Sequence, residues 1–283
     1  MTAATETASE LALEHVVIRV DDLDAAIRDY QSLGFKVVHG GAHSSGFTHN
    51  ALIHFQDGTF LELIAYIKPV TLNALLLLGI PNLVLKNTDN HIKYRFAEAI
   101  RAPEGFIHSA LFSRDIDLDT EQANRRGLKT TKAMPFHRLK PNDDMVRWNI
   151  MSPFSDDLPF VRDAYVPEQQ VSQDDTRHEN GVLGISGVSY LVKDLAASIN
   201  HYQQLLGRDA STSNQDGAHR AEFELDGVKL ILLPVEEFLD PDSVVDKRRE
   251  APVQVMLRTD NSTSLGQLPP EKTHGARILL RHE

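Results

Sequence analysis

The 283-residue chain has no cysteine, a single tryptophan and fewer basic than acidic residues. Without cysteine there are no disulfides, thiolate metal sites or cysteine nucleophiles, so any strong metal ligand must be a histidine or a carboxylate. The 29 Lys and Arg residues against 40 Asp and Glu give a net charge of −11. Because nucleic-acid binding depends on clusters of Lys and Arg, we expect no nucleic-acid partner.

Long hydrophobic runs are also missing. The most apolar stretch, residues 71–85, contains Asn73, Pro81 and Asn82 and is shorter than the roughly 20 residues that cross a bilayer. Residues 1–14 lack the basic and apolar regions of a secretory signal. We therefore expect no membrane partner and a cytoplasmic location. The chain is longer than the ~250 residues that one core usually serves, which favours two domains.

An internal repeat organises the chain. Residues 15–34 read HVVIRVDDLDAAIRDYQSLG, and residues 187–207 read GVSYLVKDLAASINHYQQLLG. Each copy has a β-rich run, an aspartate suited to cap a helix, apolar residues at helical spacing and a closing glycine; the two aspartates are Asp22 and Asp194. The repeat predicts a strand followed by a capped helix, twice.

Hairpin signals follow each copy. Asp-Gly pairs at 57–58 and 226–227 lie between alternating apolar runs, the pattern of a tight β-hairpin. A weaker copy of the unit begins at Phe106, and a truncated copy runs from Val253 to Arg281. The fold class predicted is α+β, with repeated βαβββ modules that form cupped mixed sheets.

Composition along the chain divides it into parts. Residues 11–166 form a first domain of two modules, and residues 182–283 form a second, degenerate one. Residues 67–105 interrupt the first domain with helical sequence, which we expect to cover a cleft as a lid. The polar segment 167–181 is predicted to be the linker.

Three runs resemble a known family. LEHVVIRVDDLDAAIRDYQSLGF, THNALIHFQDGTFLELIAY and LPFVRDAY are similar to the glyoxalase-like branch of the vicinal-oxygen-chelate superfamily. The resemblance covers 11–166 well, 183–235 moderately and the rest poorly. It implies two vicinal-oxygen-chelate-like domains, with a divalent metal held by His from first strands and Glu from last strands.

Strand alternation identifies the candidate ligands. His15 and Arg19 lie on the face opposite the aliphatic residues of the first strand. Glu62 stands in an otherwise apolar strand, where a carboxylate is costly to bury unless it is paired or liganded. Aligning Asp115 with Asp22 places His108 at the position of His15.

His15, Glu62 and His108 then form a two-histidine, one-carboxylate metal set, which leaves open positions on Fe(II), Mn(II) or similar ions. Zn(II), Ni(II) and Co(II) are equally compatible with this ligand set as the cofactor. The resemblance implies a fourth ligand from the last strand of the second module. Aligning Ala164-Tyr165 with Ala65-Tyr66 places Val161 at that position, and valine cannot bind metal. The alternative for each histidine is a hydrogen-bonded residue without a ligand role.

Substrate contacts are expected from Arg19, His49 and Asn50. Arg19, together with Arg147 and Arg162, offers planar guanidinium groups to an anionic substrate, although Arg147 and Arg162 equally fit exposed strand edges. His49 and Asn50 begin the run THNALIHF, where His49 is a backup ligand or a substrate contact.

Two functions follow from this set. The first is a metal-dependent lyase, isomerase or dioxygenase, in which the ion chelates adjacent oxygens of a small substrate and Glu62 moves a proton. The alternative is a protein of the same fold that binds or sequesters a small molecule without turnover. Gly187 and Ile231 replace His15 and Glu62 in the second domain, so that domain is predicted to be structural or to form a homodimer.

Overall fold

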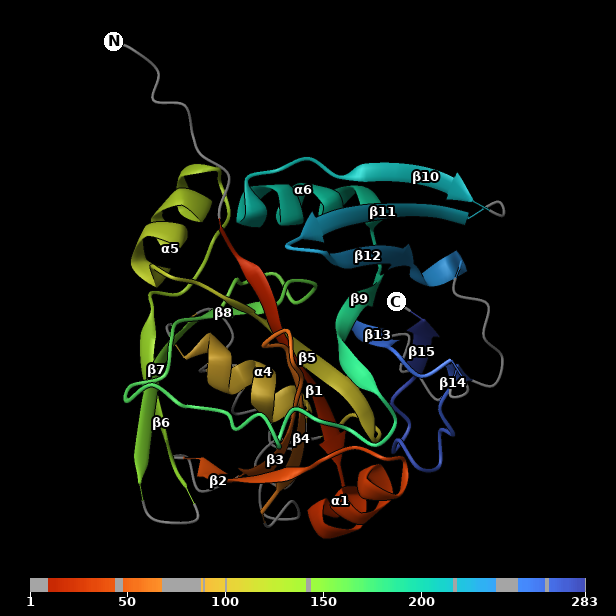
Figure 1. Cartoon of the computed structure of the whole chain (residues 1–283). Helices are drawn as coiled ribbons and strands as arrows, with labels where there is room; N and C mark the ends of the chain where they lie inside the picture. Colours follow the sequence, from red (N-terminus) through yellow and green to blue (C-terminus); the bar gives the residue numbers. More distant parts are fainter. Residues whose placement is uncertain are drawn as a thin grey trace.

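A computed structural model describes residues 10–43, 48–67, 88, 90–99, 101–140, 144–215, 218–237, 249–262 and 265–282. It consists of a closed barrel followed by a seven-stranded sheet (Figure 1). The barrel half contains β1 (Ala12–Val20), α1 (Leu23–Ser32), β2 (Val38–His43), β3 (Thr48–His54), β4 (Phe60–Tyr66), α4 (His91–Ala99), β5 (Gly105–Phe112), α5 (Ile116–Arg125), β6 (Met134–Leu139), β7 (Met145–Met151) and β8 (Phe160–Arg162).

The second half contains β9 (Val182–Val192), α6 (Leu195–Leu206), β10 (Ser211–Gln215), β11 (Ala218–Leu225), β12 (Val228–Pro234), the 3-10 helix η1 (Val235–Glu237), β13 (Ala251–Thr259), β14 (Gly266–Gln267) and β15 (Ile278–His282). Its strand order is β10-β11-β12-β9-β13-β15-β14. Residues 167–181 contain neither helix nor strand. No helix among the described residues is long and apolar enough to cross a membrane.

Two βαβββ modules build the barrel, in the order β1-β4-β3-β2-β6-β7-β8-β5. In each module the first strand pairs in parallel with the last, β1 with β4 and β5 with β8. The modules meet where β1 and β5 run antiparallel. The predicted α+β fold of repeated modules is confirmed. The cupped sheet also closes on itself, because β2 pairs with β6 at His43 and Arg138.

The predicted helices and hairpins begin or end at residues with the expected capping and turn geometry. Asp22, Asp115 and Asp194 each accept a hydrogen bond at 3.0 Å from the backbone N–H three residues ahead, which satisfies a free donor at a helix start. Gly207 ends α6 in the left-handed conformation. Both Asp226 and Gly227 have positive φ, as a two-residue hairpin requires.

A β-bulge interrupts the first strand of each barrel module. Leu13 pairs with Leu111 and His15 with Ala110, so Glu14 is the extra residue of β1. A second register shift, between Val17 and Ile18, leaves Ile107 as the extra residue of β5, directly before His108. Because a bulge adds one residue to a strand, it shifts the alternation of side chains between faces. Glu14 therefore joins His15 on the inner face of the barrel.

The outer face of the barrel and the second sheet share one apolar core, which includes α1 and α6. The inner face holds two smaller clusters. Both contain residues of the insertion: Ile92 packs with Trp148 and Phe160, and Ala99 packs with Val17 and Ile64. Helix α4 thus lies against the inner face of the barrel (Figure 1). Most of the rest of the predicted lid, residues 68–87, 89 and 100, is outside the described residues.

Candidate functional site

A group of polar side chains lies inside the barrel and is called the polar cluster here. Its members come from β1, β2, β3, β4, β6 and β8, so that only the closed barrel brings them together: Glu14, His15, His43, Asn50, Glu62, Arg138 and Arg162. His15, Asn50, Glu62, Arg138 and Arg162 are buried.

Glu62 is the centre of the polar cluster. Its Oε2 lies 3.5 Å from Nε2 of His15 and its Oε1 lies 3.6 Å from Nε2 of His43. Asn50 Nδ2 donates a hydrogen bond of 2.6 Å to Glu62 Oε1. Each oxygen of this buried carboxylate therefore faces an imidazole nitrogen.

His15 is held in one orientation. Its Nδ1 donates to Glu14 Oε2 at 3.0 Å, which turns Nε2 toward Glu62. Its ring stacks on Phe60 with centroids 4.5 Å apart. Arg162 Nε lies 2.5 Å from the same Glu14 oxygen and balances its charge. A carboxylate on the remote nitrogen is what orients histidines that bind metal ions.

His43 approaches Glu62 from the other side. Its Nδ1 is 2.9 Å from Thr48 Oγ1, and its ring edge faces Trp148 at 6.5 Å. Burial lowers the pKa of His43 from its ordinary value. The ring is therefore neutral near pH 7 and keeps a lone pair on one nitrogen.

The charge of Glu62 results from opposing effects. Burial acts to raise the pKa of its carboxyl, but His43, His15, the hydrogen bond from Asn50 and the charge of Arg138 together lower it. Glu62 is thus an anion at neutral pH, as a ligand or a proton acceptor must be.

Asn50 and Arg138 pack closely against the backbone of β2. Arg138 Nη1 donates to Asn50 Oδ1 at 3.5 Å. A Cβ atom at Gly40 would lie only 2.0 Å from Asn50 Oδ1 and 3.1 Å from Arg138 Nη1. Glycine at position 40 therefore makes room for the side chains that support Glu62.

His108 lies apart from this group, under α4. Its Nε2 donates to the carbonyl of Arg95 at 3.3 Å, and its ring contacts Phe96 and Phe160 edge-on. Burial, followed by the charge of Arg95, lowers the pKa of His108 well below its ordinary value. The structure therefore brings His15 and Glu62 together, and the third predicted ligand points to a backbone carbonyl instead.

No group of three His, Asp or Glu side chains among the described residues is arranged to hold a metal ion as it stands. The position equivalent to Glu62 in the second module also needs correction. Glu62 pairs with Val17, and the matching partner of Ala110 is Phe160. The fourth position therefore falls on Phe160, while Val161 packs in the outer core. Neither side chain binds metal.

The residues predicted to contact the substrate do not lie together. Asn50 belongs to the polar cluster, whereas His49 lies beside Ala65, whose side chain packs in the outer core. Arg19 pairs with Asp21 at 2.5 Å, at the opposite end of β1 from Glu14. Arg147 is exposed on the outer face of β7.

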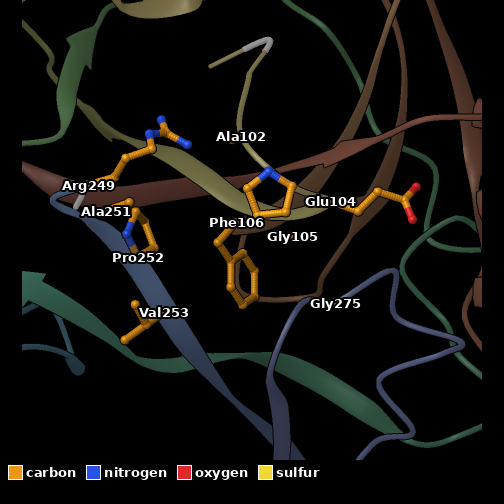
Figure 2. A pocket seen from close by; sticks show the side chains of 10 residues that line it. Ala102, Glu104, Gly105, Phe106, Arg249, Ala251, Pro252, Val253 and Gly275 are labelled. Carbon is orange, nitrogen blue, oxygen red and sulfur yellow. The ribbon is translucent and has the colours of Figure 1, made fainter. Parts of the chain in front are cut away.

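A small hollow lies at that other end, between the starts of β5 and β13 (Figure 2). Glu104, Phe106, Arg249 and Pro252 are among its walls. Its volume of about 40 Å³ is close to the ~30 Å³ that one water occupies in the liquid. This hollow is too small for a substrate; a wider one of about 960 Å³ lies beside it, with Arg19, Glu104 and His274 among its walls.

Three members of the polar cluster were not predicted as site residues. Glu14 had a readable signal: the aliphatic residues occupy odd positions up to Leu13 and even positions from Val16, and such a change of phase indicates a bulge. His43 and Arg138 had none, because they face Glu62 only after β2 pairs with β6.

Residues 13–206 match the family model described as Glyoxalase-like domain. A search of curated proteins finds no match. The fold is similar to a hypothetical protein from Staphylococcus aureus, with TM-score 0.71 and 15% identity over 96% of this chain and 100% of that chain. A variant of 4-hydroxymandelate synthase from Streptomyces coelicolor has TM-score 0.54 and 12% identity, covering 92% and 78%. The Mn(II)-bound glyoxalase from Novosphingobium aromaticivorans has TM-score 0.51 and 11% identity, covering 92% and 69%.

Proposed function

We propose that this chain, which belongs to the glyoxalase-like family of the vicinal-oxygen-chelate superfamily, is a metal-dependent enzyme acting on a small oxygenated molecule. His15 and Glu62 would hold a divalent ion, with His43 or His108 as the third protein ligand. Such an ion would supply Lewis-acid stabilisation for an enolate or alkoxide developing on a substrate with adjacent oxygens.

One observation carries the proposal, namely the two imidazoles that flank Glu62. Their Nε2 atoms lie 3.5 and 3.6 Å from its oxygens. Ligand bonds of about 2.0–2.2 Å place neighbouring donors of one ion roughly 3.0–3.5 Å apart. The donor types and these two separations fit a divalent ion, and His43 fits them without the movement of α4 that His108 would need.

The other residues of the cluster prepare these donors. Glu14 accepts a hydrogen bond from the Nδ1–H of His15, which leaves the lone pair on Nε2 facing Glu62. Asn50 holds one oxygen of Glu62, and Glu62 would also move a proton of the substrate. The ligand set does not choose among lyase, isomerase and dioxygenase reactions.

Metal binding by purified protein tests the proposal. We expect wild type to take up one ion per chain in calorimetric titrations with Fe(II), Mn(II), Zn(II), Co(II) and Ni(II). His15→Ala and Glu62→Gln should weaken the uptake more than the ~10–100-fold that loss of an outer-shell partner costs. Comparing His43→Ala with His108→Ala identifies the third ligand.

His49→Ala is the matched control, because His49 lies on the outer side of β3. Its affinity should equal that of wild type. If wild type takes up no ion, or His15→Ala binds as tightly, the metal assignment is wrong. A chain without metal uptake that still binds a small molecule would fit the sequestering function, which the position of α4 on the inner face also favours.

A further inference from the structure

Arg138 is a buried arginine that forms no ion pair with any of the described residues. Its exposed fraction is 4%, and its Nε has no hydrogen-bond partner there. The contacts it does make are the 3.5 Å bond to Asn50 and a ring contact with Tyr165 at 5.7 Å. A buried guanidinium that forms no ion pair is costly, and an anionic ligand bound to it would lower that cost.

The neighbouring arginine shows the contrast. Arg162 is equally buried, but Glu14 balances its charge. Its guanidinium lies 3.7 Å over the same Tyr165 ring. Glu62 already accepts the hydrogen bond from Asn50 and faces the two imidazoles of His15 and His43. Arg138 is therefore the cation of the polar cluster that is left for a ligand.

Aromatic side chains form an apolar wall beside it. Trp148 packs edge-on against Tyr165 at 5.3 Å and stacks on Phe136 at 6.4 Å. Val146, which pairs with Arg138 across β6 and β7, belongs to the same inner cluster as Trp148. A ligand anchored by Arg138 would place its remaining atoms against these rings.

We propose that the substrate is a small organic carboxylate with an aromatic or apolar body, and that Arg138 binds its carboxylate. This inference rests on the proposed function, since it assigns the substrate class of the same site. A guanidinium offers two parallel N–H groups to a planar carboxylate. One unbalanced positive charge matches a monoanion better than a phosphate, which would leave excess negative charge in a buried site.

Trp148 is the only tryptophan of the chain, so its fluorescence reports on this wall. Metal-free protein is titrated with benzoate and with benzamide, a neutral molecule of the same shape. We expect saturable changes with benzoate and at least 10-fold weaker binding of benzamide. Arg138→Met should weaken benzoate binding by about 10- to 100-fold, as loss of charge-assisted hydrogen bonds does.

Arg147→Met is the matched control, because Arg147 lies on the outer face of the neighbouring strand. It should bind benzoate as wild type does. Equal binding of benzoate and benzamide, or unchanged binding by Arg138→Met, would overturn the proposal.

Thermal unfolding covers the case in which the variant is unstable. If Arg138 binds the carboxylate, the melting temperature of wild type should rise with benzoate, and that of Arg138→Met should not. A large loss of stability, or failure to fold, would mean that Arg138 has a structural partner and would also overturn the proposal. Repeating the titration with metal present separates the two proposals. If the protein takes up no ion but prefers benzoate, only the metal proposal fails. If it takes up an ion but does not prefer benzoate, only the substrate proposal fails.

Discussion

At the scale of single residues, the polar cluster shows which of its members can be recognised from the sequence. Glu62 was predicted because a carboxylate stands out in a strand that is otherwise apolar, and His15 because alternation places it opposite the aliphatic face of its strand. Glu14 was not, because strict alternation assumes an unbroken strand and the bulge reverses its face. Alternation therefore places His15 and Glu62 on the same inner face, where they meet, and misplaces the residue that orients His15.

Gly40 is predicted to be essential for the position of Asn50. Gly40→Ala would place a methyl group 2.0 Å from Asn50 Oδ1, so the side chain must move and its bond to Glu62 weakens. We expect a loss of about 1–3 kcal/mol in the free energy of unfolding, as for overpacking in a core, measured by urea denaturation.

A double-mutant cycle is the control for this mechanism. In an Asn50→Ala background the clash is absent, so Gly40→Ala should cost clearly less there. Equal costs in both backgrounds would show that Gly40 acts through its backbone and not through Asn50.

At the scale of elements, the capped helices and the Asp-Gly hairpins were readable, because each depends on residues close in sequence. The insertion was predicted to be helical and to cover a cleft, and α4 packs with Val17 and Trp148. What the sequence could not give was that α4 covers His108. Both α4 and the strands around it carry apolar residues, so periodicity alone does not show which of them pack together.

The segment 167–181 was predicted to be a linker, and its end is held firmly against the barrel half. Lys36 N–H donates to His178 Nδ1 at 2.9 Å, and His178 Nε2 donates to the carbonyl of His54 at 2.9 Å. The ring also contacts Phe35 and Phe55. Because Nδ1 must accept a hydrogen bond, a proton there would break the contact with Lys36.

Stability should therefore fall as the pH drops through the ordinary histidine range. Burial lowers the pKa of His178, so the unfolded chain takes up a proton near pH ~6.5 that the folded chain refuses. The contribution is present above that pH and is lost below it. We expect His178→Phe, which keeps the ring, to reduce the difference in unfolding free energy between about pH 7.5 and 5.5, by less than ~1.4 kcal/mol because the ring is partly exposed.

His137→Phe is the control for this measurement, since His137 is exposed on the outer face of β6. It should leave the pH dependence of stability unchanged. If His178→Phe keeps the full pH dependence of wild type, another buried histidine carries it and the assignment to the linker contact is wrong.

At the scale of the whole molecule, the two halves share one core and several close contacts. Tyr190 of β9 hydrogen-bonds Ser109 of β5 at 2.8 Å, and both residues are buried. Asp57 pairs with Arg258 at 2.7 Å over Gly184, where a Cβ atom would lie 1.7 Å from the Asp57 carboxylate. The repeat in the sequence indicated two similar units, but it carried no information on how their outer faces meet.

We therefore predict that both halves unfold in one transition. Scanning calorimetry should give a single peak whose calorimetric and van't Hoff enthalpies agree, as cooperative units do. Two variants sharpen the test. Tyr190→Phe leaves Ser109 without its buried partner and should cost about 1–3 kcal/mol. Val228→Ala removes apolar volume from β12, a strand of the second half. In one cooperative unit both variants lower the same melting temperature; a second peak that Val228→Ala alone shifts would show that the halves unfold independently.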